Sequence, residues 1–449
     1  MLFGVEGLRV VDAEREADGS VTVWVVTDHA GAACCPDCGS RAGRVYERVV
    51  TRPRDLRRGL DAVTVCWVKR RWRCEDRACA RQTFTESVPA VPPRCRMTSR
   101  LRELAGAEVA ERGCTVAEAA RWQGVSWPVA HAAFAERADP VLARAPALVA
   151  HLGIDEHRRG RARWRADEQA GVYTLLADRW HTCFVDLSGD QGLLGQVEGR
   201  TADDAAYWLW QAGPAWRDAV QVAAIDMCSI YASAIRRMLP QAQVVVDLFH
   251  VVQLAVKVTG DVRRRAVRGK YGRRGRSGDP EYGIKGLLVR NLEHLSAGQF
   301  AKVMDTLSGD RYGQQVLAAW IGKEKLRDAL NLRARVTGST PGERDVRGRL
   351  FAFYDWCAQN DDIPELVTLA RTISRWEDEI VAAVLTGVSN ARSESLNRIA
   401  KLEARQAYSF RNPANQRRRV RTACTRGRSR HRAAAGKSRL AAGRPPDPG

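Results

Sequence analysis

Long apolar runs are absent from this chain of 449 residues. No stretch approaches the roughly 18 consecutive apolar residues that a membrane-spanning helix needs, so the sequence predicts no membrane association. The first residues, MLFGVEGLRVVDAERE, lack a basic segment followed by an apolar one, so they do not resemble a signal peptide. We therefore expect a cytoplasmic protein.

Acidic residues are scarce relative to basic ones. The chain has 52 Asp and Glu against 72 Lys and Arg, a formal net charge of +20, and its pI is about 9.9. Such an excess favours a polyanionic partner, with nucleic acid ahead of a membrane surface. We expect double-stranded DNA as the partner and a location on the nucleoid.

The twelve cysteines are mostly single and scattered, which is typical of buried small apolar residues in a reducing compartment. One cluster differs, because Cys35 and Cys38 form a CxxC turn, and Cys74 and Cys79 follow a strand-like run, VTVCWVKRRWRC. Two such cysteine pairs predict a four-cysteine ribbon that binds a structural Zn²⁺ and leaves no ligand position open for catalysis. Cys34 remains an alternative first ligand, and unrelated free thiols are the alternative to a metal site.

Residues 99–135 have the pattern of a helical bundle. Within it, CTVAEAARWQGVSWPVAHAAF predicts a helix, a tight turn at Gly124 and a second helix capped by Ser126. Thr115 and Glu118 have the spacing of a capping box at the start of the first helix. This is the pattern of a DNA-binding helix-turn-helix, with a plain helical hairpin as the alternative. The residues expected to lie toward the major groove are Ser126, Trp127 and Val129.

Three aspartates follow apolar strands: Asp155 after HLGI, Asp226 after VQVAAI and Asp247 after QVVV. The order from the first of these is three strands, a helix, a strand, a helix and a strand. That order matches the α/β ribonuclease-H-like fold, in which the first and fourth strands are neighbours. Asp155 and Asp226 would then meet although 71 positions separate them. Burying an unpaired carboxylate is costly, so a metal ion or a cation is expected beside them.

A third carboxylate would come from the basic helical segment SESLNRIAKLEARQ. Glu394 is the first candidate and Glu403 the competing one. Three carboxylates can bind two Mg²⁺ (or Mn²⁺) ions, which prefer oxygen ligands, for an in-line phosphodiester displacement. For Asp247 and His250 we expect either a supporting position beside this site or, for the histidine, an ordinary place in the core.

The chain is long enough for about three domains, and hydrophobic residues make up 45% of it. We expect the zinc ribbon in residues 1–95 and the helix-turn-helix in 96–145. The catalytic core would occupy 146–250, be interrupted by an all-helical insertion in 251–385, and end with its last helix in 386–412. Residues 413–449 would be a basic, disordered tail.

Two basic segments are further candidates for DNA contact. The segment 261–276, DVRRRAVRGKYGRRGR, has eight basic residues and is predicted to be a mobile arm on phosphates. Beyond it, residues 411–449 contain twelve Lys or Arg and one acid, Asp447, which predicts disorder until DNA is bound, or simply a solubilising tail. The arginines proposed for DNA contact in the first segment are Arg263, Arg264, Arg265, Arg273 and Arg274.

Nearly the whole chain resembles the ISL-three type of bacterial insertion-sequence transposases. The resemblance rests on the cysteine pairs, the helix-turn-helix, GIDE at 153–156, IDM at 225–227, DLFH at 247–250, AWIGKEKLR at 319–327 and SNARSESLNRIAKLEARQAYSFRN. It implies a DDE transposase whose ribonuclease-H-like core is interrupted by helices after the fifth strand. It also implies that Asp155, Asp226 and Glu394 bind the metals.

The resulting hypothesis is an enzyme that binds the terminal inverted repeats of its own element, cuts strand ends and joins the 3′-hydroxyl to target DNA. A homodimer or higher oligomer on DNA is expected, because two ends must be paired. Two alternatives remain: a non-catalytic DNA-binding regulator with the same zinc ribbon and helix-turn-helix, and a structure-specific nuclease of the same fold.

Overall fold

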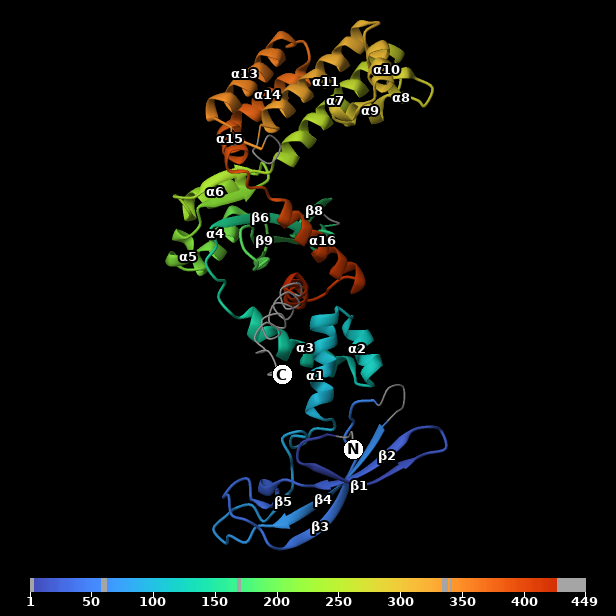
Figure 1. The fold of residues 1–449 in the computed structure, drawn as a ribbon, viewed down its shortest axis with the longest axis vertical. Coiled ribbons are helices and arrows are strands. Elements are labelled where there is room, and N and C mark those ends of the chain that lie inside the picture. Colours follow the sequence, from blue (N-terminus) through green and yellow to red (C-terminus); the bar gives the residue numbers. More distant parts are fainter. Residues whose placement is uncertain (1–3, 58–62, 168–170, 333–337, 340, 426–449) are drawn as a thin grey trace, which may run out of the picture. The chain divides into compact units, whose positions relative to one another are not determined.

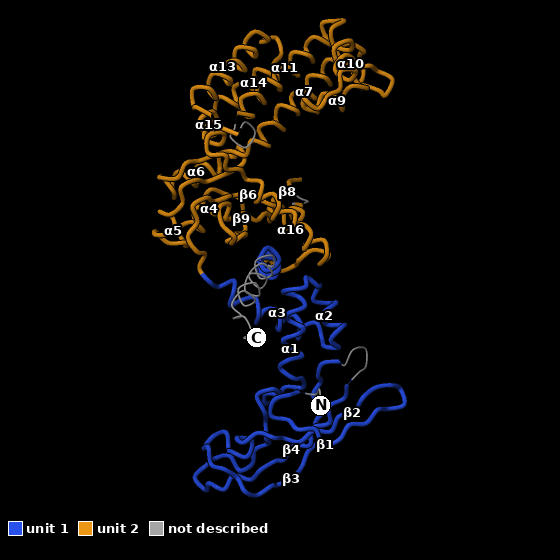
Figure 2. The backbone as a smooth tube through the Cα atoms, viewed as in Figure 1, with its two compact units in different colours: residues 1–144, 414–426 blue, residues 145–413, 427–449 orange. Residues whose placement is uncertain are grey.

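Apolar residues at alternate positions build the sheet of the first of two compact units (Figure 2). The computed structural model describes residues 4–57, 63–167, 171–332, 338–339 and 341–425. The first unit comprises Met1–Arg144 with Ala414–Arg426, and the second comprises Ala145–Pro413 with Gly427–Gly449. The predicted ribbon and helix-turn-helix segments therefore both fall in the first unit.

The sheet of the first unit has the order β1-β2-β4-β3, with β5 paired to the end of β4. Its core is formed by valines and by Trp67, whose indole N–H donates to Thr27 Oγ1 at 2.9 Å. Because β2 and β4 run parallel, the chain must cross over between them, and the first cysteine pair lies in that crossover. The strands are β1 Leu8–Arg15, β2 Val21–Thr27, β3 Val45–Thr51, β4 Val63–Arg73 and β5 Thr83–Thr85, with a short helix η1 at Ala30–Ala33.

A helical bundle follows the sheet. Its elements are α1 Ser99–Ala107, the short π-helix η2 Glu108–Arg112, α2 Val116–Gln123 and α3 Trp127–Leu142. The capping box predicted at Thr115 and Glu118 is present, and Gly124 ends α2 with a left-handed φ of 62°. Ser126 stands at the N-cap of α3, but its side chain makes no capping hydrogen bond, contrary to expectation. Gly106 allows helices α1 and α3 to cross closely. A Cβ at this position would come within 2.6 Å of the Ala133 carbonyl oxygen, so a larger residue would force the helices apart.

Residues 413–425 form a helix that packs against this bundle, although the sequence predicted a disordered tail from residue 413. Arg418 holds Asp139 of α3 with two hydrogen bonds of 2.5 and 3.0 Å, and Arg419 donates to the carbonyl oxygens of Val109 and Gly113. Val420 is fully buried. These arginines have structural partners that composition alone could not indicate. The rest of the predicted tail, from residue 426, lies outside the described residues.

The second unit contains a five-stranded sheet in the order β10-β9-β6-β11-β12. The first three strands are antiparallel neighbours, whereas β11 is parallel to both β6 and β12. Strands β6 and β11 are therefore adjacent, as the sequence predicts. The elements are β6 His151–Arg158, β9 Trp180–Asp186, β10 Leu193–Glu198, α4 Ala202–Gln211, α5 Pro214–Asp218, β11 Val222–Ile225, α6 Ser229–Met238 and β12 Gln243–Val246. A separate two-stranded ribbon pairs β7 Arg163–Asp167 with β8 Val172–Ala177.

Helices occupy the chain from Leu248 to Thr386, close to the range 251–385 predicted to be helical. They pack beside one another and share one hydrophobic core with the sheet (Figure 1). Their bounds are α7 Leu248–Tyr271, α8 Pro280–Gly283, α9 Lys285–Val289, η3 Leu292–His294, α10 Ala297–Leu307, α11 Arg311–Leu330, α13 Glu343–Gln359, α14 Pro364–Arg375 and α15 Glu377–Thr386. Helix α16, Ala391–Gln406, then returns to the sheet and lies against β6 and β9 (Figure 1). Among the described residues, no helix is both long and apolar enough to cross a membrane.

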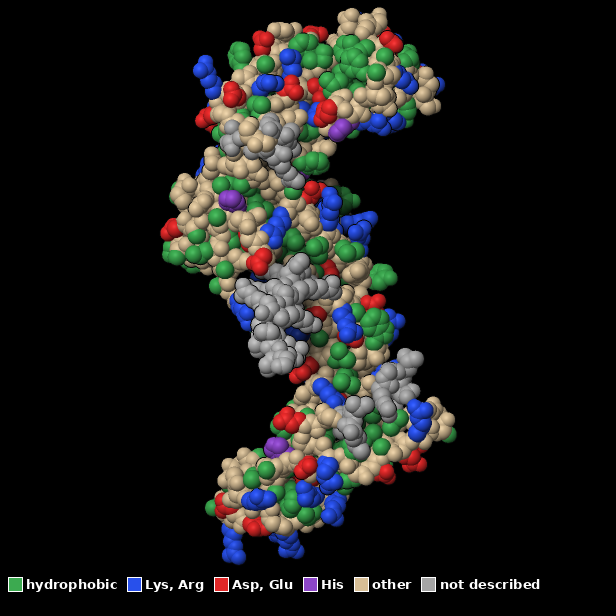
Figure 3. Space-filling view, viewed as in Figure 1, with side chains coloured by type: hydrophobic (Ala, Val, Ile, Leu, Met, Phe, Trp, Pro, Cys, Tyr) green, Lys and Arg blue, Asp and Glu red, His purple; other side chains and the backbone are tan. Residues whose placement is uncertain are grey.

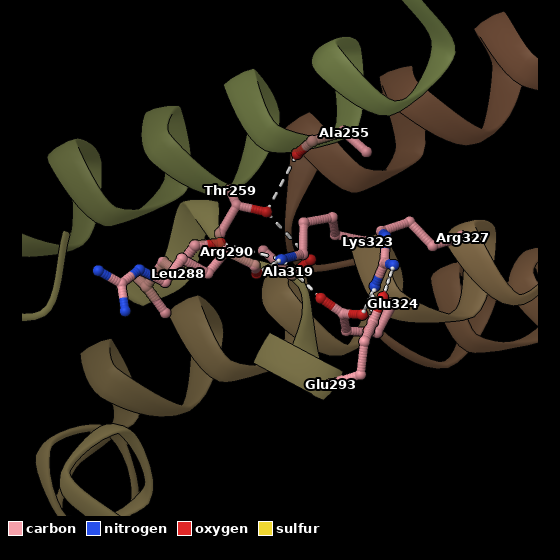
Figure 4. Close-up of polar contacts among 9 residues, drawn as sticks. All are labelled: Ala255, Thr259, Leu288, Arg290, Glu293, Ala319, Lys323, Glu324 and Arg327. Atoms are coloured by element: carbon pink, nitrogen blue, oxygen red, sulfur yellow. Dashed lines mark hydrogen bonds and ion pairs between the residues drawn. The ribbon is translucent and has the colours of Figure 1, made fainter. Parts of the chain in front are cut away.

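The segment AWIGKEKLR on α11 holds these helices together through a buried lysine (Figure 4). Lys323 is 1% exposed, and its ammonium donates to the carbonyl oxygens of Leu288 and Arg290 at 3.0 and 2.7 Å. It also pairs with Glu324 Oε1 at 2.6 Å. One turn later Arg327 binds Glu293. Because a buried charge is costly unless it is paired, these contacts tie α9 and η3 firmly to α11.

Candidate functional site

Asp155 and Asp226 meet because their strands are parallel neighbours. The register pairs Ala224 with Gly153, so two residues further along Asp226 comes level with Asp155. Burial and then the nearby Asp226 raise the pKa of Asp155 to about 7. Two carboxylates that repel each other in a partly dry site favour a divalent cation between them. The donor set thus fits a hard metal ion with oxygen ligands.

Asp247 and His250 stand on the other side of Asp226. Asp247 follows β12 and caps α7 by accepting from the backbone N–H of Phe249 at 3.1 Å. His250, one turn into α7, has its Nε2 at 3.3 Å from Asp226 Oδ2. The ligand atoms of the three residues lie within 4.8 Å of one another. Burial raises the pKa of Asp226, His250 lowers it, and Asp247 raises it again.

Helix α16 presents Asn390, Glu394 and Asn397 at spacings of four and three residues, which places them on one side of the helix. The Asn397 amide donates to Asp155 Oδ2 at 2.7 Å. The side chain of Asn390 donates to the carbonyl oxygen of Ile154 at 3.4 Å, and its hydrogen bond to Asp226 lowers the pKa of that carboxyl. The two asparagines therefore contact the two aspartates directly.

Among the described residues, neither candidate for the third acid belongs to the cluster of Asp226, Asp247 and His250. Glu394 stands between the two asparagines in the first turns of α16, but its side chain is 43% exposed and pairs with Arg398 at 3.0 Å. Glu403 is buried further along the same helix. The structure thus clusters Asp226 with Asp247 and His250, brings Asp155 near enough to Asp226 to raise the pKa of its carboxyl, and leaves Asp155 and Glu394 outside that cluster.

A glycine lets α16 approach the sheet. A Cβ on Gly153 would come within 2.4 Å of Ser393 Oγ and 2.8 Å of Asn390 Oδ1, so a larger residue there would push the helix away. Neither the glycine nor the direct contacts of the asparagines were part of the sequence prediction. The signal available in the sequence was the spacing of Asn390, Glu394 and Asn397.

The four predicted cysteine ligands converge in the first unit. Cys35 and Cys79 have their sulfurs 3.9 Å apart, and those of Cys38 and Cys74 are 3.6 Å apart. A tetrahedral Zn²⁺ with Zn–S bonds of about 2.3 Å requires sulfurs about 3.8 Å apart, so the geometry fits this ion. Hydrogen bonds from Ser40 lower the pKa of the Cys38 thiol to about 7, whereas burial and the neighbouring thiols raise the pKa of Cys74 to about 12 and that of Cys79 as well, so the sulfur geometry carries the zinc assignment. Cys34 is not in the cluster.

The residues predicted to face DNA in the helix-turn-helix differ in exposure. Ser126 and Trp127, at the start of α3, are exposed, and the Trp127 ring stacks on His131 with centroids 4.9 Å apart. Val129 instead packs against the core of the bundle, so less of it is available to DNA. Lys and Arg side chains are spread over both units on the face drawn in Figure 3.

The basic segment 261–276 is not the mobile arm that the sequence predicted. Helix α7 continues through it to Tyr271. Arg265 is bound by Glu365 at 2.7 and 3.0 Å, and Arg273 by Asp279 at 2.9 and 2.7 Å. Arg264 pairs with Asp261, and Arg263 is half-buried, which leaves Arg274 as an exposed member of the predicted set. The prediction of a mobile arm was wrong because the segment continues α7 and carboxylates neutralise part of its charge: Asp261 and Asp279 nearby in sequence, and Glu365 a hundred positions away.

Comparisons with known proteins identify the family of this chain. The model of the ISL3 DDE transposase family matches residues 152–420. A second model, for the helix-turn-helix domain of transposase family ISL3, matches residues 86–138. The transposase for insertion sequence element IS1001 of Bordetella parapertussis is 25% identical over 417 residues, covering 91% of this chain and 93% of that protein.

Among solved structures, the Drosophila P element transposase strand transfer complex is similar over 61% of this chain and 75% of that one. Its TM-score is 0.32 at 10% identity, a likeness too low to inform the fold. The DDE model, however, covers more than half of the chain, including the strands of Asp155 and Asp226 and the helix of Glu394. The chain therefore belongs to the ISL3 family of DDE transposases, which are DNA-binding proteins of insertion sequences.

Proposed function

We propose that the second unit is a ribonuclease-H-like catalytic core, interrupted after β12 by the helices α7–α15, and that it cuts and joins DNA strands. The strand order β10-β9-β6-β11-β12, with β6 and β11 parallel, supports this assignment. The observation that carries the proposal is that the parallel register brings Asp226, directly after β11, level with Asp155 within β6.

In this proposal Asp155, Asp226 and Glu394 bind two divalent ions, magnesium or manganese. The chemistry that such ions supply when bound is activation of a water or 3′-hydroxyl for in-line attack on a phosphodiester, with stabilisation of the leaving oxygen. His250 stabilises the anionic form of Asp226, and Asn397 fixes the rotamer of Asp155. Glu394 would turn from its exposed pair with Arg398 toward the aspartates, a change that a surface ion pair opposes only weakly.

The first unit would recognise the terminal inverted repeats of the element. Ser126 and Trp127 at the N-terminal end of α3 stand where a helix-turn-helix reads the major groove. The cysteine site would bind one structural Zn²⁺ and stabilise the part of the first unit's sheet that carries the cysteine pairs. Because two ends must be paired for joining, we propose that a homodimer or higher oligomer assembles on the DNA.

The test is a cleavage and joining assay with purified protein, Mg²⁺ and duplex DNA from the flanks of the gene. Asp226→Asn should abolish cleavage and joining while leaving binding of the same DNA intact. Cutting by Asp226→Asn at the wild-type rate would refute the assignment of the site. If the wild type cuts DNA but does not join it, the protein is a nuclease. If the wild type binds DNA but does not cut it, the protein is a DNA-binding regulator.

A further inference from the structure

The ribbon formed by β7 and β8 is exposed on both faces. Trp164 is 56% exposed and Tyr173 is 71% exposed, and Val172, Leu175 and Leu176 are exposed as well. Tyr173 and Leu175 lie on the same face as Trp164, whereas Val172 and Leu176 lie on the opposite face, and exposed apolar side chains of this size indicate a binding site. An isolated two-stranded hairpin is only marginally stable in water, so a partner would also stabilise it.

The register separates the ribbon into two chemically different faces. Trp164 is opposite Leu175, and Ala166 is opposite Tyr173, so both aromatic rings lie on the same face. Arg165 is opposite Thr174 and therefore lies on the other face. Arg161, Arg163 and Arg165 are exposed, whereas Arg158, Arg159 and Arg179 contact Trp180, Glu198 and the carbonyl oxygen of Phe410. The partner must therefore combine flat apolar groups with negative charge.

The base of the ribbon is firmly anchored to the sheet. The Trp180 ring is flanked by the guanidinium groups of Arg158 and Arg200, at 5.4 and 4.6 Å from its centroid. Arg179 donates to the carbonyl oxygen of Phe410 at 3.3 Å, just beyond α16. The ribbon thus follows directly on β6, the strand that carries Asp155, and it begins only a few residues beyond the candidate active site.

We propose that this ribbon contacts a DNA strand whose bases are unpaired next to the cutting site, with Trp164 and Tyr173 stacking on those bases. The proposal rests on the proposed function of the core. Bases inside a duplex present no free faces to an aromatic ring, whereas unpaired bases do, and aromatic stacking combined with arginine–phosphate contact is how proteins bind single strands. A second copy of this chain would satisfy the apolar face but not the arginines.

The experiment compares two DNA probes by fluorescence anisotropy: a fully paired duplex from the flank of the gene, and the same duplex with a short run of mismatches at one end. The full-length wild type should bind the mismatched probe more tightly. The double variant Trp164→Ala/Tyr173→Ala should lose this preference, on the order of tenfold in affinity per aromatic ring, and bind the paired duplex as before. Both side chains are exposed, so thermal unfolding should be unchanged.

A matched control is Tyr207→Ala/Trp210→Ala on α4, where two aromatic rings are also exposed, by 58% and 62%, but lie outside the ribbon. It should keep the preference. The proposal is overturned if the wild type shows no preference or if the ribbon variant retains it. Loss of self-association in light scattering, with the DNA preference kept, would make the ribbon a protein–protein interface instead.

These outcomes are separable from those of the cleavage assay. Asp226→Asn should keep the preference for mismatched DNA, because the ribbon and not the metal site provides it. If the wild type cuts no DNA but shows a ribbon-dependent preference, the proposed function fails, and with it the position next to a cutting site, while the contact of Trp164 and Tyr173 with unpaired bases stands.

Discussion

The amide of Asn397 donates a hydrogen bond of 2.7 Å to Asp155 Oδ2. It joins α16 to β6 across 242 positions of sequence and leaves Asp155 little freedom to rotate. Asn397→Ala should lower the affinity for Mn²⁺, measured by calorimetry, and the cleavage rate by about 10- to 100-fold, as for other residues that orient metal ligands. Asn291→Ala, whose side chain caps no helix, is the control. Unchanged Mn²⁺ affinity in Asn397→Ala would show that the contact does not orient the ligand.

The cysteine cluster predicts one zinc ion per chain, detectable by elemental analysis. Cys38→Ser or Cys74→Ser should remove it and destabilise the first unit, because structural zinc contributes about 10–16 kcal/mol of apparent binding free energy in small zinc domains. Cys95→Ser, at an exposed cysteine outside the cluster, should retain the ion. Equal zinc content in all three variants would refute the site.

Metal-free protein should lose stability as the pH rises through the range in which Asp155 ionises. Its pKa is raised from 3.8 to about 7, so between these values the folded state binds more protons than the unfolded chain. The contribution is full below about pH 4 and decreases toward pH 7 by up to about 1.4 kcal/mol per pH unit. Urea unfolding in EDTA measures it. Asp155→Asn should flatten this slope, and a slope equal to that of the wild type would mean that another group causes the pH dependence.

Lys323 should be essential for the stability of the helical region. Lys323→Met leaves the carbonyl oxygens of Leu288 and Arg290 without their buried donor, at a cost of about 1–3 kcal/mol for each group, while Glu324 keeps Arg327 as its partner. Lys302→Met, at an exposed lysine of α10, should change the unfolding free energy little. Similar midpoints for the two variants in urea would mean that the buried pair contributes little net stability.

The sequence was most informative where local chemistry decides the structure. Alternating valines, the capping box at Thr115 and the order of strands and helices all follow from residues close together along the chain. The cysteine pairs are equally local, because a CxxC turn presents both thiols to one point. The adjacency of β6 and β11 could be predicted as well, because few strand orders suit such a succession of elements.

Charge was the least reliable guide. The arginines at 263–274 indicated a mobile arm, but Glu365 and Asp279 hold two of them, and the arginines of 418–419 serve a buried helix. A count of charges cannot show which are paired, because the pairing depends on how the chain folds, whether the carboxylate is six residues away, as Asp279 is from Arg273, or a hundred, as Glu365 is from Arg265.

By itself, the sequence determined which residues are candidates to bind metal and DNA: the cysteine pairs, the aspartates that follow apolar runs and the start of the second helix of the helix-turn-helix. The structure differs at Asp155, because β6 continues beyond it to Arg158. Only the tertiary structure decided which of these candidates meet. Asp226 lies beside His250 and near Asp155, whereas Asn390 and Asn397 reach the aspartates and Glu394 pairs with Arg398. The reason is that α16 returns to β6 after the whole helical region, and its depth over the sheet is set by the missing side chain at Gly153.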